Sequence, residues 1–176
     1  MMAPAAESPY RAHRRAFIAA CEAAGVDAIA RVHPARGPDG KPLFMDSAAM
    51  GPRHAPRAVL LVSRDAAGSR ILTELVRGGV LPPPDARLVL VHALDPAAFA
   101  GVPGDANWSR KMLGAVATED LAKVKDLAIL CLNGAGEMQE SAVAEALGES
   151  NINVMLIAAD TDDVRRALAA FYGGLE

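Results

Sequence analysis

The chain has 176 residues, of which 52% are hydrophobic and only 4% aromatic, enough for one domain with a core of aliphatic side chains. Its formal net charge is −3, and no segment has the clustered Lys and Arg residues of a nucleic-acid-binding surface. No stretch approaches the ~20 apolar residues of a membrane helix, and the N-terminus has charged residues where a secretory signal is apolar. We therefore expect a soluble, cytoplasmic protein without nucleic-acid or membrane partners.

The N-terminal half predicts a helix, a hairpin and two buried strands. Ser8 can cap a helix over residues 10–24, Pro9 suits its first position and Gly25 can end it. The Pro-Asp-Gly composition of residues 36–40 predicts a turn between two extended segments, and continuous aliphatic runs predict strands buried on both faces. The extended segments are 28–33 and 42–46, the buried strands are 58–62 and 88–91, and a helix over 68–77 lies between those strands.

The C-terminal half continues the alternation. Residues 95–111 contain Pro and Gly and are predicted to form a loop, after which Thr118 is expected to cap a short helix. The remaining predicted elements are a strand at 127–132, a helix at 140–147, a strand at 153–158 and a last helix capped by Thr161. Buried strands that alternate with helices predict an α/β fold with a mostly parallel, mixed central sheet, helices on both faces and an N-terminal edge hairpin.

Single residue types add two expectations. The cysteines, Cys21 and Cys131, lie in apolar patterns and are expected to be buried free thiols. Three arginines on the first helix, Arg11, Arg14 and Arg15, form either an anion site or a solvated helix face, and we favour the solvated face.

Five segments between Pro9 and Met112 resemble, in the correct order, a family of uncharacterised bacterial zinc-carboxypeptidase-like proteins, relatives of metallocarboxypeptidases and succinylglutamate desuccinylases. The segment 10–17 looks like the opening helix of that family, and 91–96 is similar to its strand-end sequence His-Ala-Leu-Asn-Pro. The other matching segments are 37–40 with Leu43 and Asp46, 51–52 with 58–63, and 105–112.

The segment that binds zinc in that family is missing here. The family's first core strand runs into His-Gly-Val-Glu-Gly, whose His and Glu bind the metal, whereas here Ser63 is followed by Arg-Asp-Ala-Ala-Gly-Ser at 64–69. The family's third ligand lies in a motif like Asp-Leu-His-Thr-Gly, and the nearest residues, 130–134, contain no His. Because a catalytic zinc needs about three protein ligands, we expect no metal, no cofactor and no catalytic residue. A rebuilt site with His92 and Asp65, giving a residual amide or peptide hydrolase, stays open.

Arg110 is the first ligand-binding candidate. It matches the family's arginine that holds a substrate carboxylate, and arginine binds carboxylates bidentately without a metal. The rival interpretation is an exposed loop arginine.

A second resemblance supplies the other candidates. Residues from about 125 to 172 look like the ACT regulatory domain of aspartate kinases, and the match is carried by 127–132, 133–138, 152–157 and 163–171. The resemblance implies an amino-acid ligand near Asn133, Gly134 and Gly136, at the interface of a homodimer. Backbone amides in a glycine-containing turn before a helix attract anions, whereas the rival interpretation is a plain tight turn.

The distribution of charge also divides the chain into the two regions that carry these two resemblances. Residues 1–116 contain 14 Lys and Arg against 10 Asp and Glu, and residues 117–176 contain 4 against 11. We interpret 1–116 as a shortened carboxypeptidase-like region and 117–176 as an acidic segment that is ACT-like or completes the same sheet. The expected function is a non-catalytic binding or scaffold module for a small carboxylate or amino acid. The alternatives are a regulatory amino-acid-binding homodimer and a residual hydrolase.

Overall fold

The computed structural model describes residues 7–132, 137–148, 151–157 and 160–173. Helices and strands alternate through most of this length. The elements in chain order are α1 (Pro9–Ala23), β1 (Ala28–Arg36), β2 (Pro42–Met50), β3 (Arg57–Ser63), α2 (Ala66–Arg77), β4 (Ala86–His92), α3 (Pro96–Phe99), α4 (Ala106–Asp120), β5 (Asp126–Leu132), α5 (Glu137–Leu147), β6 (Asn151–Ile157) and α6 (Thr161–Gly173).

The strands form one six-stranded sheet in the order β1-β2-β4-β3-β5-β6. The pairs β1–β2 and β2–β4 are antiparallel, and the pairs β4–β3, β3–β5 and β5–β6 are parallel. The predicted α/β fold, with a mixed, mostly parallel sheet and an edge hairpin, is therefore confirmed. Strands β4 and β5 flank β3, so that both halves of the chain contribute to the same sheet.

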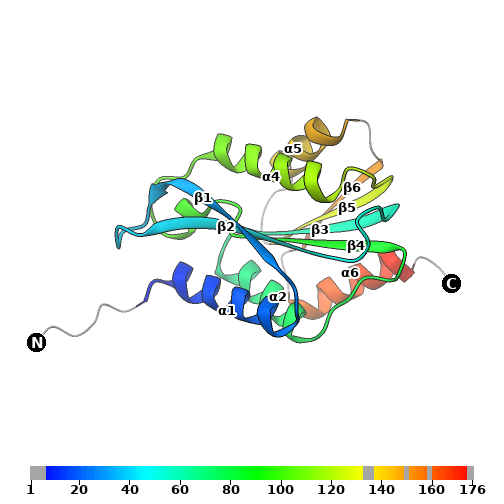
Figure 1. Ribbon diagram of the computed structural model, residues 1–176, viewed down its shortest axis with the longest axis horizontal. Coiled ribbons are helices and arrows are strands. Elements are labelled where there is room, and N and C mark those ends of the chain that lie inside the picture. Colours follow the sequence, from blue (N-terminus) through cyan, green and yellow to red (C-terminus); the bar gives the residue numbers. More distant parts are fainter. Residues whose placement is uncertain (1–6, 133–136, 149–150, 158–159, 174–176) are drawn as a thin grey trace, which may run out of the picture.

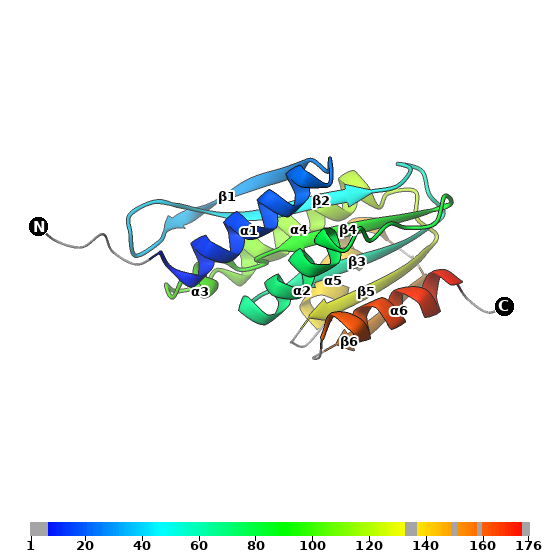
Figure 2. The same ribbon diagram turned by 90° about the horizontal axis from the view of Figure 1, so that it is seen from below.

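Helices cover both faces of the sheet. Figure 1 and Figure 2 show α1, α2 and α6 on one face and α4 and α5 on the other. Within β3, Leu61 belongs to the core under α1, α2 and α6, and Leu60 belongs to the core under α4 and α5. Both faces of the strand are buried, which is why its sequence is aliphatic without polar alternation. Among the described helices, none combines the length and apolar character that a membrane crossing requires.

The predicted loop over 95–111 is wrong. Asp95 caps α3 and Asp105 caps α4 by accepting hydrogen bonds from backbone N–H groups of the third residue of each helix. Pro96 is the first residue of α3, which suits proline, and Gly101, Pro103 and Gly104 lie in the short connection between the helices. Thr118 caps no helix. It lies inside α4, where its hydroxyl donates to the carbonyl of Gly114 at 3.0 Å.

The cap of the last helix is one residue earlier than predicted. Thr161 is the first residue of α6, and the carboxylate of Asp160 accepts a hydrogen bond from the N–H of Asp163 at 3.0 Å. The hydroxyl of Thr161 instead donates to Glu74 of α2. The sequence pattern located the helix correctly, but only the packing of α6 on α2 decides which polar side chain is the cap.

Candidate functional site

The carboxyl ends of β3 and β5 form a topological switch point. These strands are neighbours, and the helices that follow them, α2 and α5, lie on opposite faces of the sheet (Figure 1). Ligands of open α/β sheets bind in the crevice outside such strand ends. This edge is therefore the candidate functional site.

A row of polar side chains crosses this edge on the face that α1 and α2 cover. The strand register places Asp46 of β2 opposite His92 of β4 and Ser63 of β3 opposite Leu132 of β5, and the parallel register of β3 with β4 aligns the two pairs. All four side chains are buried. The fold thus brings together a carboxylate, a hydroxyl and an imidazole from three strands.

His92 is enclosed by α1 and α2. Its Nε2 atom lies 2.6 Å from the Oγ atom of Ser69, and its ring stacks on Phe17 with a centroid separation of 4.8 Å. Burial, reinforced by the charges of Arg14 and His13, lowers the pKa of His92 to about 3, so the imidazole is neutral at physiological pH. A serine beside a neutral histidine suits nucleophilic catalysis, but here both side chains are 0% exposed.

The other members of the row also have partners within the fold. Asp46 accepts hydrogen bonds from Nε and Nη2 of Arg14 at 2.7 and 2.9 Å. The Oγ atom of Ser63 donates to the carbonyl of Val91 and accepts from the N–H of Ala93, both at 3.3 Å. These contacts hold the strands and α1 together, and within the described residues Nδ1 of His92 is left as the unpaired polar side-chain atom of the row.

Helix α2 lies directly on the ends of β3 and β5. A Cβ atom at Gly68 would be 3.0 Å from the Cβ of Ser63 and 3.3 Å from the Cβ of Leu132, closer than the ~3.5–4.0 Å of a favourable carbon contact. Asp65 fixes this first turn by accepting a hydrogen bond from the N–H of Gly68 at 2.9 Å. The short connection after β3 therefore draws α2 onto the strand ends and closes the crevice on this face.

Carboxylates that follow the parallel strands are used as helix caps. Asp65, Asp95 and Asp160 accept hydrogen bonds from first-turn N–H groups of α2, α3 and α6 at 2.9 to 3.0 Å. Within the described residues, no three His, Cys, Asp or Glu side chains are grouped so that they could hold a metal ion. A catalytic zinc needs about three such ligands, and the described residues at this edge do not supply them together.

Arg110 lies in the second turn of α4 rather than in a loop. Its Nε and Nη2 atoms donate to Oε2 of Glu145 at 3.1 and 2.5 Å, and Nη2 also donates to Ser141 at 2.8 Å. The side chain remains 39% exposed. It lines a cleft of about 400 Å³ between α4 and α5, whose other lining residues are Asn107, Lys111, Gly114, Ala142, Glu145 and Ala146.

Besides the arginines of α1, the residues that the sequence singled out are those of one loop and the two cysteines. Asn133, Gly134 and Gly136 lie outside the described residues. Cys21 and Cys131 are free and buried, as predicted, and burial raises the pKa of each thiol to about 11.

The arginines of α1 have specific partners instead of forming a uniformly solvated face. Arg14 forms an ion pair with the buried carboxylate of Asp46, and Arg11 and Arg15 form ion pairs with Asp39 and Glu7. The predicted solvated face is therefore wrong for Arg11 and Arg14, whose side chains are 17% and 26% exposed, because the hairpin places Asp39 and Asp46 beside the helix.

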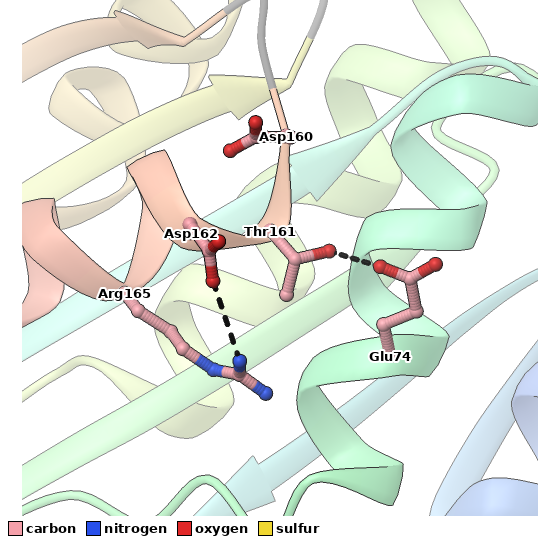
Figure 3. A pocket seen from close by; sticks show the side chains of 5 residues that line it. All are labelled: Glu74, Asp160, Thr161, Asp162 and Arg165. Atoms are coloured by element: carbon pink, nitrogen blue, oxygen red, sulfur yellow. Dashed lines mark hydrogen bonds and ion pairs between the residues drawn. The ribbon is translucent and has the colours of Figure 1, made fainter.

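A second cavity of about 400 Å³ lies between α2 and the start of α6 (Figure 3). It is lined by Glu74, Asp160, Thr161, Asp162 and Arg165. Figure 3 shows Thr161 directed at Glu74, to which its hydroxyl donates, and Asp162 paired with Arg165 at 3.6 Å. These polar groups hold α6 against α2 and pair with one another.

Comparisons with known proteins agree with this fold. The chain is similar to a glutaminyl cyclase from Porphyromonas gingivalis, with 14% identity over 87% of this chain and 77% of that one and a TM-score of 0.56. It is also similar to a leucine aminopeptidase precursor from Bacteroides thetaiotaomicron, with 12% identity, 89% and 72% coverage and a TM-score of 0.44. It is further similar to a putative zinc-dependent exopeptidase from Bacteroides vulgatus, with 13% identity over 89% of this chain and 72% of that one and a TM-score of 0.39. The likeness to the glutaminyl cyclase, at 14% identity, shows a shared fold alone.

Sequence comparison is more specific. A search of curated proteins found no match. The family model described as protein of unknown function (DUF2817) matches residues 7–102, which is more than half of the chain. The matched region extends from α1 through β4 to the end of α3 and includes Asp46, Ser63 and His92 of the buried row. The chain belongs to the DUF2817 family.

Proposed function

We propose that this chain is a non-catalytic member of its family, built on a zinc-carboxypeptidase-like framework, and that it binds a small carboxylate. The observation that carries the first half of the proposal is the closure of the switch-point crevice at Gly68. Where a hydrolase of this kind needs an open metal site with a bound water, this chain has a helix packed on the strand ends and carboxylates committed to helix caps.

The cleft between α4 and α5 supports the second part of the proposal, the binding of a small carboxylate. Glu145 and Ser141 hold the Arg110 guanidinium in one orientation, and Lys111 and Asn107 line the same cleft. Two cations against one carboxylate leave the cleft with an excess of positive charge. Its volume of about 400 Å³ falls within the ~300–1,000 Å³ of small-molecule sites. A carboxylate is the ligand group that this arrangement favours.

Two measurements test the absence of catalysis. The purified protein, before and after incubation with zinc, is analysed for bound metal and assayed with N-acetyl amino acids and aminoacyl anilides. We expect less than one zinc per ten chains and no hydrolysis above background. Stoichiometric zinc, or hydrolysis that a chelator abolishes, would contradict the proposal and revive the residual hydrolase.

The carboxylate site is tested by titration with succinate and L-glutamate, followed by changes in NMR chemical shifts. We expect Arg110→Ala to weaken binding by about 10- to 100-fold, since a hydrogen bond to a charged group contributes about 1.5–3 kcal/mol. Arg166→Ala is the matched control, because Arg166 is an exposed arginine of α6 that pairs with Asp163. Equal affinities of wild type and Arg110→Ala would exclude this cleft. The regulatory amino-acid-binding homodimer stays a prediction, because its loop lies outside the described residues.

A further inference from the structure

Gln139 is a buried amide without a partner. It lies in the first turn of α5 and is 1% exposed. Neither its Oε1 nor its Nε2 atom has a hydrogen-bond partner among the described residues. A buried donor or acceptor without a partner costs the desolvation free energy of that group, so such a side chain points to a function other than packing.

Gln139 differs from the other buried side chains that lack a partner. The others are His33, Arg57, Thr73, Arg87 and His92, and each of them leaves one polar atom unpaired. Gln139 leaves both a strong acceptor and an N–H₂ group unpaired within one planar amide. It therefore presents a donor and an acceptor side by side.

The position of Gln139 directs this amide at the switch point. Ala142 and Val143, one turn further along α5, are buried against the sheet in the core under α4 and α5, so Gln139 lies on the same face of the helix. Helical side chains lean toward the N-terminus of their helix. Because α5 follows β5, its N-terminus lies at the carboxyl ends of the strands, on the face opposite to the one that Gly68 closes.

The start of α5 adds donors to the same place. First-turn N–H groups have no acceptor within their own helix, and α5 is long enough, from Glu137 to Leu147, for its dipole to favour an electron-rich group there. The buried neighbours Ala142 and Val143 are apolar, which makes the transfer of a full charge to this position costly. A neutral group with an acceptor and a donor in one plane satisfies all of these conditions.

We propose that Gln139 and the first turn of α5 form a recognition site for the carboxamide group of a small molecule. The Nε2 atom of Gln139 donates to the ligand's carbonyl oxygen, and Oε1 accepts from the ligand's N–H. This site is distinct from the Arg110 cleft, which takes a carboxylate. It lies at the switch point, on the face of the sheet opposite to the one that Gly68 closes.

The test replaces Gln139 with Met, which has a similar length and no amide. Binding of propionamide and butyramide, which have no carboxylate for the Arg110 cleft, is measured on the full chain by saturation-transfer NMR. Propionate and butyrate are the charged counterparts, and thermal unfolding is followed in parallel. We expect Gln139→Met to weaken binding of the two amides at least tenfold and to raise the melting temperature of the free protein, because a buried unpaired amide has been removed.

Three outcomes would overturn this proposal. They are a wild-type protein that binds neither amide, a Gln139→Met variant that binds them unchanged, and a Gln139→Met variant that melts at a lower temperature. The last would show that the chain itself satisfies the amide. Arg110→Ala separates the two proposals: we expect it to weaken binding of propionate and butyrate and to leave Gln139-dependent binding of the two amides unchanged, so either site can fail without the other.

Discussion

Two glycines inside helices predict opposite effects of the same substitution. A methyl group at Gly68 would lie 3.0 Å from the Cβ of Ser63 and 3.3 Å from the Cβ of Leu132. Those atoms are fixed to the central strands and cannot rotate away. Overpacking of this kind costs about 1–3 kcal/mol, and helix propensity returns at most about 1 kcal/mol, so we expect Gly68→Ala to destabilise the protein by about 1–2 kcal/mol.

Gly114 is the matched control. In the middle of α4, a methyl group at this position would lie 3.8 Å from the Cβ of Ala146 and 3.9 Å from the carbonyl oxygen of Ala142, which are ordinary contact distances. Gly114→Ala should therefore gain the helix propensity of about 1 kcal/mol. Since ~1 kcal/mol shifts the melting temperature of a domain of this size by about 2–4 °C, the two variants should differ by about 4–12 °C.

Urea and thermal unfolding, followed by circular dichroism, measure this difference. The double variant Ser63→Gly with Gly68→Ala should be more stable than the sum of its single variants predicts, because the nearest Cβ atom is gone. If Gly68→Ala stabilises the protein as much as Gly114→Ala does, then α2 does not press on the strand ends. The closure argument behind the proposed absence of catalysis would then be refuted.

Burial determines three further responses. Arg14→Met should lower the free energy of unfolding by about 3–5 kcal/mol, because it leaves the fully buried Asp46 unpaired. Asp46→Ala should lower it less, because the Arg14 side chain is 26% exposed and can be hydrated. Equal losses in urea unfolding would contradict this. Cys21 and Cys131 should react with iodoacetamide at pH 8 only after unfolding, and rapid labelling of the native protein would exclude this. Because burial raises the pKa of each thiol from about 9 to about 11, the free energy of unfolding should decline as the pH rises through this range. The pKa of His92 falls from 6.5 to about 3 on folding, so the contribution of the neutral imidazole to stability is complete above about pH 6.5 and is lost as the pH falls toward 3. His92→Asn should therefore weaken the acid sensitivity of the fold in a circular-dichroism titration. An unchanged acid transition would count against this.

Local signals in the sequence predicted most elements of the fold. Ser8 with Pro9 located α1, the Pro-Asp-Gly turn located the hairpin, and the aliphatic runs located β3, β4 and β5. The prediction was wrong where the signal was mixed. Asp105 caps α4 directly after a Pro- and Gly-containing connection, and the composition of that connection concealed the start of the helix.

The candidate site was visible in the sequence only as an absence. The segment after Ser63 lacks the histidine and glutamate of the zinc motif, and one sequence is enough to see this. Nothing in the sequence indicates that Arg14 pairs with Asp46, 32 residues away, or that Gln139 is buried without a partner. From the sequence alone, a charged residue on an amphipathic helix is predicted to be exposed to solvent, because its neighbours in the fold are not known.

The sequence by itself therefore determined the alternation of elements and the aliphatic core, because these depend on residue types within a few positions of one another. The tertiary structure decided how the ends of β3 and β5 are covered. Strand order and register placed Asp46, His92 and Ser63 in one row, and the short connection between β3 and α2 brought Gly68 against that row. Which polar groups are satisfied and which are left unpaired depends on contacts between distant segments, and these exist only once the chain has folded.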